Sequence, residues 1–329
     1  MNSARELPIK SSTATRQAPL PPEWKGSAIL GVMSQFNRDQ LGFITRLRSL
    51  GDVVRARFLY VPAYFIYHPT DIEYVLVTNA KNFRKAMSLR SNFFYRLVGN
   101  GLLTSEGDFW RRQRRLAQPA FHKQRISNFG DLMVEYTERM LAGWKVGETR
   151  DLHRDMMRLT LEIVVKTLFD ANVSGDVDNV GRVLSEIVKP FASQATLKWI
   201  LDNRLPTPGH RQFHRSVGQI DQIIYRIIAE RRASELDKGD LLSMLLQAQD
   251  EDGSQMTDAQ LRDEVITLFL AGHETTALAL SWTWYLLATH QDVAVKFHEE
   301  LDRVLKGRSP QLSDLPQLRY SEMIAKETM

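Results

Sequence analysis

The hydrophobic and polar positions of this chain follow a helical pattern over most of its length. Amphipathic or apolar stretches bounded by capping residues, glycine or proline predict helices rather than strands. The predicted helices cover residues 35–50, 72–77, 125–144, 151–169, 180–193, 212–234, 240–249, 261–290, 292–306 and 315–329. This pattern indicates a mainly α protein.

One stretch near the N-terminus alternates with a period of two instead. Val53–Val61 is β-rich, and Tyr64–Tyr67 follows after Pro62. Two short strands around a turn predict a hairpin. Thr70 and Glu73 have the spacing of a capping box and are expected to begin the next helix. A small β region is therefore expected in front of the main helices.

The predicted helix at 261–290 is apolar on nearly every side. Glu274 is the only formally charged side chain between Val265 and Thr289. Such a helix is expected to be buried all round rather than to lie on a surface. Thr257, with Gln260 three residues later, predicts a capping box at its start.

The centre of this helix carries an unfavourable polar segment, Ala-Gly-His-Glu-Thr-Thr at 271–276. Gly272 costs about 1 kcal/mol relative to alanine, and β-branched threonines are weak helix formers. The Glu274 carboxylate needs a partner, or a proton, in apolar surroundings. Local cost without a visible structural gain is typical of a functional site.

Three other interpretations of this segment compete. The first, which stays open, is a core helix whose central polar groups simply have hydrogen-bond partners in the protein interior. A transmembrane span fits the length, but the polar centre would be expensive in lipid. A zinc-protease site requires a second histidine four residues after His273, and that position holds Ala277.

The composition is that of a globular protein, and the length alone allows one to three domains. The 329 residues are 43% hydrophobic and 25% charged, and the net charge of +4 argues against general nucleic-acid binding. No cysteine occurs, which removes disulfides and thiolate metal sites. Residues 1–25 are polar and contain no apolar run like a signal peptide or anchor. We expect a flexible N-terminal arm at 1–25, a domain over 26–329, and a cytoplasmic protein without a membrane anchor.

A second motif lies upstream of the long helix. Trp110 and Arg114 are four residues apart, so they share one helix face. At this spacing an indole N–H and a guanidinium can reach the same anion. Arg111 and Arg115 point elsewhere, either as solvated charges or as a basic patch for an acidic partner.

Both motifs resemble those of the cytochrome P-450 family, the heme-thiolate monooxygenases. Segment 271–276 matches the family's oxygen-binding pattern, [Ala/Gly]-Gly-x-[Asp/Glu]-Thr-[Thr/Ser], and a matching Pro-Ala-Phe follows the Trp-x-x-x-Arg motif at 119–121. The resemblance implies that Trp110 and Arg114 hold a propionate of heme b, iron protoporphyrin IX. It also implies a partial cytochrome P-450 fold, with a long central helix, a helix bundle and an N-terminal β hairpin.

The same resemblance implies roles along the central helix. Ala271 and Gly272 would leave room beside the heme, and Gly272 would permit local widening of the helix. Thr275 would hydrogen-bond dioxygen. Glu274 and Thr275 would relay protons, because an acid and an alcohol together suit general acid catalysis.

Glu327 resembles the glutamate of the family's Glu-x-x-Arg helix. The arginine would come next, but Met329 is the last residue, and the cysteine that binds the heme iron in the family is also absent. We therefore expect 26–329 to be an incomplete domain that lacks its C-terminal heme-binding part. The heme site would be incomplete, and the fragment alone would be inactive.

The implied function is heme-dependent activation of O2 and hydroxylation of a lipophilic small molecule, such as a fatty acid or a terpenoid. Electrons would come from a ferredoxin or a flavoprotein reductase, as in soluble bacterial-type members. An irregular, aromatic-rich region at 79–107 would contribute to the substrate pocket.

Two alternative functions stay open. A non-catalytic helical domain, acting as a pseudoenzyme or binding a partner, is one alternative. The other is a peroxide-driven or isomerising heme enzyme, which often lacks the acid–alcohol pair present at Glu274 and Thr275.

Overall fold

A computed structural model describes the chain in two compact units, residues 1–84 and 85–329. The described residues are 20–85, 92–122, 126–127, 129–170, 208–234 and 238–329. The predicted helix at 180–193 and residues 1–19 of the predicted arm lie outside them.

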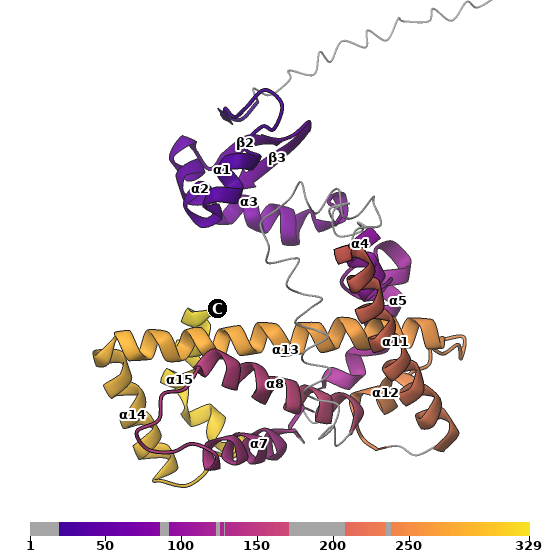
Figure 1. The fold of residues 1–329 in the computed structure, drawn as a ribbon, viewed down its shortest axis with the longest axis vertical. Helices are drawn as coiled ribbons and strands as arrows, with labels where there is room; N and C mark the ends of the chain where they lie inside the picture. Colours follow the sequence, from indigo (N-terminus) through magenta and orange to yellow (C-terminus); the bar gives the residue numbers. More distant parts are fainter. Residues whose placement is uncertain (1–19, 86–91, 123–125, 128, 171–207, 235–237) are drawn as a thin grey trace, which may run out of the picture. The chain divides into compact units, whose positions relative to one another are not determined.

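The first unit contains a three-stranded sheet in the order β1-β2-β3. Figure 1 labels its strands β2 and β3. The strands are β1 (Glu23–Trp24), β2 (Val53–Phe58) and β3 (Val61–Ile66). The predicted hairpin is confirmed, because β2 and β3 pair antiparallel with Val53 opposite Ile66. The sequence pattern did not show β1, which pairs parallel with β2 and falls inside the range expected to be an arm.

Short helices accompany this sheet, and two of the local predictions need correction. The helices are α1 (Met33–Arg38), α2 (Gln40–Leu47), η1 (Arg48–Leu50), α3 (Pro69–Glu73), η2 (Tyr74–Thr78) and η3 (Ala80–Asn82). The single helix predicted at 35–50 is divided because Asp39 caps α2, accepting from the Gly42 N–H at 2.9 Å. The capping box predicted at Thr70 and Glu73 is wrong, since the His68 ring accepts from the Thr70 N–H and caps α3.

The second unit is built mainly from helices in its described part. These are α4 (Asn92–Val98), α5 (Gly107–Ala117), η5 (Gln118–Phe121), α7 (Gly130–Ala142), α8 (Leu152–Phe169), α11 (Pro208–Ser234), α12 (Leu241–Gln247), α13 (Asp258–Thr289), α14 (Gln291–Leu305), η6 (Leu312–Gln317) and α15 (Arg319–Thr328). The mainly α class with a small β region is confirmed. The irregular region predicted at 79–107 is wrong in part, since it contains η3 and α4.

Helix α13 is the long helix around which the second unit is organised. Its predicted capping box is confirmed: Thr257 Oγ1 accepts from the Gln260 N–H, and Gln260 Oε1 accepts from the Thr257 N–H at 2.8 Å. Helix α8 lies along it and is its most extensive neighbour (Figure 1). Among the described residues, no helix combines the length and hydropathy that a membrane crossing requires.

The expectation that α13 is buried all round is wrong for its second half. The side that meets α8 is buried, including His273 at 4% exposure and Ala277 at 0%. On the opposite side Leu278, Trp282 and Tyr285 are 41%, 56% and 58% exposed. A helix that is apolar on every side needs neighbours on every side, and the described residues cover only one of them here.

Candidate functional site

Trp110 and Arg114 lie one turn apart on α5, as their spacing predicted. The Arg114 guanidinium carbon is 5.1 Å from the centroid of the Trp110 ring. A guanidinium over an indole face is a favourable cation–π arrangement. The contact holds both donors on one face of the helix.

The other arginines of α5 are each paired with a carboxylate. Arg111 pairs with Asp108. Arg112 and Arg115 both reach Asp250, at 2.8 and 2.6 Å. The basic patch considered at Arg111 and Arg115 is thus largely neutralised within the chain.

Arg114 differs from these neighbours. Its side chain has no ion pair or hydrogen bond within the described part of the chain, and it is exposed. A guanidinium carries five N–H donors and no acceptor. Arg114 therefore keeps its donors available for an anion.

Lys85 is a third cationic group at this site, and the sequence analysis missed it. Its Nζ lies 5.6 Å from the centroid of the Trp110 ring and donates to the carbonyl oxygens of Leu102 and Ser105 at 2.8 and 2.9 Å. Burial lowers the pKa of Lys85, while Glu106 and Glu264 oppose that shift. No sequence spacing relates Lys85 to Trp110, so only the fold brings them together.

The segment 99–106, here called the α4–α5 loop, is docked on the first half of α13. The Asn100 N–H donates to Asp263 at 2.8 Å, and the Leu102 N–H donates to Glu264 Oε2 at 3.0 Å. The approach at Gly101 requires glycine, since a Cβ there would lie 2.4 Å from Thr267 Oγ1.

Glu264 is the most deeply buried carboxyl group at this site, with 0% of its surface exposed. Burial raises its pKa to about 7; the Leu102 N–H and Lys85 oppose the shift, and Asp263 adds to it. Its Oε1 has no hydrogen-bond partner among the described residues. The sequence analysis did not single out Glu264, because a glutamate near a helix start usually faces solvent.

Glu264 shares one face of α13 with the predicted oxygen-binding residues. Ala271 and Thr275 follow it at i+7 and i+11, spacings that return to the same side of a helix. The α4–α5 loop covers this face at Glu264, whereas Ala271 and Thr275 are exposed. The loop thus connects the Trp110–Arg114 pair to the face that carries Ala271 and Thr275.

The residues of segment 271–276 divide between two sides of α13. His273 faces α8, where its Nε2 is 3.0 Å from the Met157 carbonyl oxygen, and burial lowers its pKa. Gly272 also approaches α8, because a Cβ there would lie 2.9 Å from Val164 Cγ2. Gly272 thus permits close packing of α13 against α8.

Thr275 and Glu274 lie at the exposed side without disturbing the helix. The Thr275 hydroxyl donates to the Ala271 carbonyl oxygen, and α13 is one continuous helix across this point. The local widening of the helix at Gly272, which the family resemblance implies where O2 binds, stays a prediction. Glu274 is half-buried, with no ion pair or hydrogen bond among the described residues, so its carboxylate is available to a ligand or to water.

Glu327 is exposed on α15. The start of α15 is held by Glu300 of α14, which accepts from the N–H groups of Tyr320 and Ser321 at 2.8 Å each. A carboxylate at a helix N-terminus satisfies free N–H groups and complements the helix dipole. This contact fixes α15, and with it Glu327, against α14.

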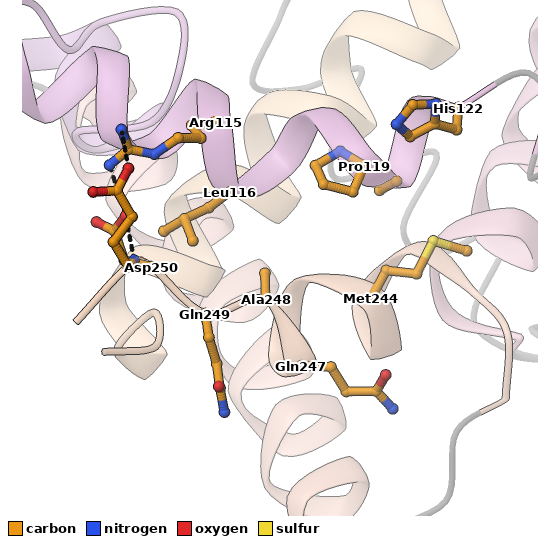
Figure 2. A pocket seen from close by; sticks show the side chains of 11 residues that line it. Arg115, Leu116, Pro119, His122, Met244, Gln247, Ala248, Gln249 and Asp250 are labelled. Atoms are coloured by element: carbon orange, nitrogen blue, oxygen red, sulfur yellow. Dashed lines mark hydrogen bonds and ion pairs between the residues drawn. The ribbon is translucent and has the colours of Figure 1, made fainter. Parts of the chain in front are cut away.

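A separate pocket of about 550 Å³ lies where α5 and η5 face α12 (Figure 2). Figure 2 shows Leu116 and Met244 in its wall and the Arg115–Asp250 ion pair at one end. None of the predicted site residues lines it. The pocket is therefore distinct from the candidate site.

Comparison with known proteins agrees with the two motifs and the fold. The family model described as Cytochrome P450 matches residues 21–329. The chain belongs to the cytochrome P450 family. Through this family it is a heme-dependent monooxygenase, an enzyme that incorporates oxygen from O2 using electrons from a redox partner.

Three relatives come from Streptomyces. Cyclooctatin synthase of Streptomyces melanosporofaciens is 34% identical over 96% of this chain and 70% of its own length. Cyclooctat-9-en-7-ol 5-monooxygenase of the same species is 33% identical, over 98% and 68%. Pentalenene oxygenase of Streptomyces avermitilis is 32% identical, over 92% and 67%.

Heme is the cofactor that membership of this family implies, and the described residues fit it in two respects. Anionic propionates need cationic donors that are not already paired, and Arg114 is such a donor beside Trp110. The flat apolar porphyrin needs apolar surface. The exposed side of α13 at Ala271 and Leu278 offers it.

Proposed function

We propose that Trp110, Arg114 and Lys85 form the propionate site of this heme monooxygenase. The observation that carries the proposal is the free guanidinium of Arg114, stacked on Trp110 among arginines that are all paired. Lys85 directs two N–H donors to carbonyl oxygens and keeps a third, since an ammonium has three. Charge-assisted hydrogen bonds to carboxylates are roughly twice as strong as neutral ones.

The exposed face of α13 supplies the groups that handle protons. Heme, when bound, supplies the activation of O2 for insertion of one oxygen atom into the substrate. The small side chain of Ala271 leaves space on this face. The Thr275 hydroxyl, which donates to the Ala271 carbonyl oxygen, can turn to donate a proton, and the neighbouring Glu274 carboxylate can resupply it from water.

The proposed substrate is a lipophilic small molecule of mostly hydrocarbon character. Support comes from the relatives named pentalenene oxygenase and cyclooctat-9-en-7-ol 5-monooxygenase. The proposed electron donor is a ferredoxin or a flavoprotein reductase. Because Arg111 and Arg115 are paired within the chain, they are poor candidates for docking that donor.

The propionate site is tested with protoporphyrin IX and its dimethyl ester, which lacks free carboxylates. The probes contain no iron, so their binding does not depend on catalysis. We expect the full chain to bind the acid more tightly than the ester. Arg114→Ala is expected to lower the acid-to-ester affinity ratio about tenfold through loss of a charged hydrogen bond. Fluorescence titration measures both affinities.

Arg111→Ala is the matched control, because Arg111 lies on the same helix and pairs with exposed Asp108. It should leave the affinity ratio unchanged. Equal affinity of the unaltered chain for acid and ester would refute the propionate site.

Thr275→Ala tests the proton path on a longer chain that also carries the family's C-terminal heme-binding part, loaded with heme and supplied with its electron donor. We expect NAD(P)H consumption to continue, while product per NAD(P)H falls about tenfold and peroxide rises, because a positioned proton donor has been removed. Thr276→Ala serves as the control. Unchanged product per NAD(P)H in Thr275→Ala would remove Thr275 from the proton path.

A further inference from the structure

Glu264 is a buried acid that the proton chemistry above does not use. Its Oε2 accepts from the Leu102 N–H at 3.0 Å, and its Oε1 has no partner among the described residues. Burying a carboxyl group with one unbonded oxygen is costly.

Leu102, the residue that Glu264 binds, is also held from its carbonyl end. Lys85 Nζ donates to the Leu102 carbonyl oxygen at 2.8 Å. The Glu264 carboxyl group thus accepts from the Leu102 N–H, while the Lys85 ammonium group donates to the carbonyl oxygen of the same residue. Hydrogen bonds in such a chain polarise and strengthen one another.

The rest of the α4–α5 loop is fixed to α13 around this contact. Asp263 accepts from the Asn100 N–H at 2.8 Å. Gly101 lies against Thr267 without room for a Cβ. The loop has little freedom to shift along α13, so the position of Leu102 is set by the helix residues beneath it.

We propose that Glu264 is a positioning residue for the propionate site. It fixes Leu102 on α13, and Leu102 in turn fixes the ammonium group of Lys85 beside Trp110. The inference rests on the proposed function, which places a propionate at Lys85, Trp110 and Arg114. Because Glu264 shares its helix face with Thr275, it also sets the propionate site relative to the proton-handling face.

The test uses the acid-to-ester affinity ratio for protoporphyrin IX and its dimethyl ester on the full chain. Glu264→Leu is expected to lower the ratio about fivefold, since Lys85 loses its fixed acceptor. Glu264→Gln keeps an oxygen that can accept the Leu102 N–H, and should restore the ratio. Lys85→Met is a second variant and should reproduce the loss.

The outcomes separate this inference from the proposed function. If Arg114→Ala lowers the ratio but Glu264→Leu does not, the inference is overturned and the propionate site stands. An equal fall in acid and ester affinity in Glu264→Leu would reveal general loss of packing and also overturn it. If Glu264→Leu does not fold, an unchanged ratio in Lys85→Met overturns the inference. If the unaltered chain does not prefer the acid, both proposals fall.

Discussion

Replacing Arg231 with methionine is expected to lower the free energy of unfolding by about 4 kcal/mol, because it breaks a buried ion pair and leaves a carboxylate behind. Arg231 of α11 lies 2.7 Å from Asp240, and their side chains are 5% and 3% exposed. The same guanidinium donates to the Phe169 carbonyl oxygen at 2.8 Å and to Ser243. One side chain thus joins α11 to the end of α8 and the start of α12.

The measurement is the urea midpoint of the helical circular-dichroism signal, with the free energy taken from the linear dependence on urea. Arg232→Met is the matched control: its pair with Asp258 is 38% and 53% exposed and should contribute less than about 1 kcal/mol. Adding Asp240→Leu to Arg231→Met should recover part of the loss, because no unpaired charge then remains. A loss of the same size in both single variants would show that burial of the pair is not the cause.

Glu264→Gln is expected to reveal a pH-dependent contribution of Glu264 to stability. The free energy of unfolding of the unaltered chain, minus that of Glu264→Gln, should fall by roughly 3 kcal/mol between about pH 5 and about pH 8. The pKa of Glu264 is raised from 4.5 to about 7, mainly by burial. Between these values the folded chain binds a proton that the unfolded chain does not. The stabilisation is therefore present at pH values below 4.5 and is lost as the pH rises through about 7.

Glutamine has nearly the same shape and does not titrate, so subtracting its stability removes the contributions of other groups. The charged groups facing Glu264 are Asp263, which adds to the rise in pKa, and Lys85, which opposes it. Urea unfolding of both proteins at several pH values gives the difference. A difference that does not change with pH would mean that Glu264 stays charged in the folded chain.

Local spacing in the sequence determined the features that depend on neighbouring residues. The length of α13, its Thr257–Gln260 capping box and the shared face of Trp110 and Arg114 all follow from helical geometry within a few turns. The motif at 271–276 indicated the family, which the comparisons confirmed. These features need no knowledge of what the rest of the chain does.

The tertiary structure alone decided which partner meets each face. Position 272 has no room for a larger side chain because Val164 of α8 approaches it. Lys85 lies at the Trp110 site because its ammonium group is bonded to the α4–α5 loop. Glu264 is buried because that same loop covers it, although its sequence position suggested an exposed glutamate. Helical periodicity determines which side chains lie on one side of a helix. The segments that cover that side come from distant parts of the chain, and their contacts produce no periodic pattern in the sequence.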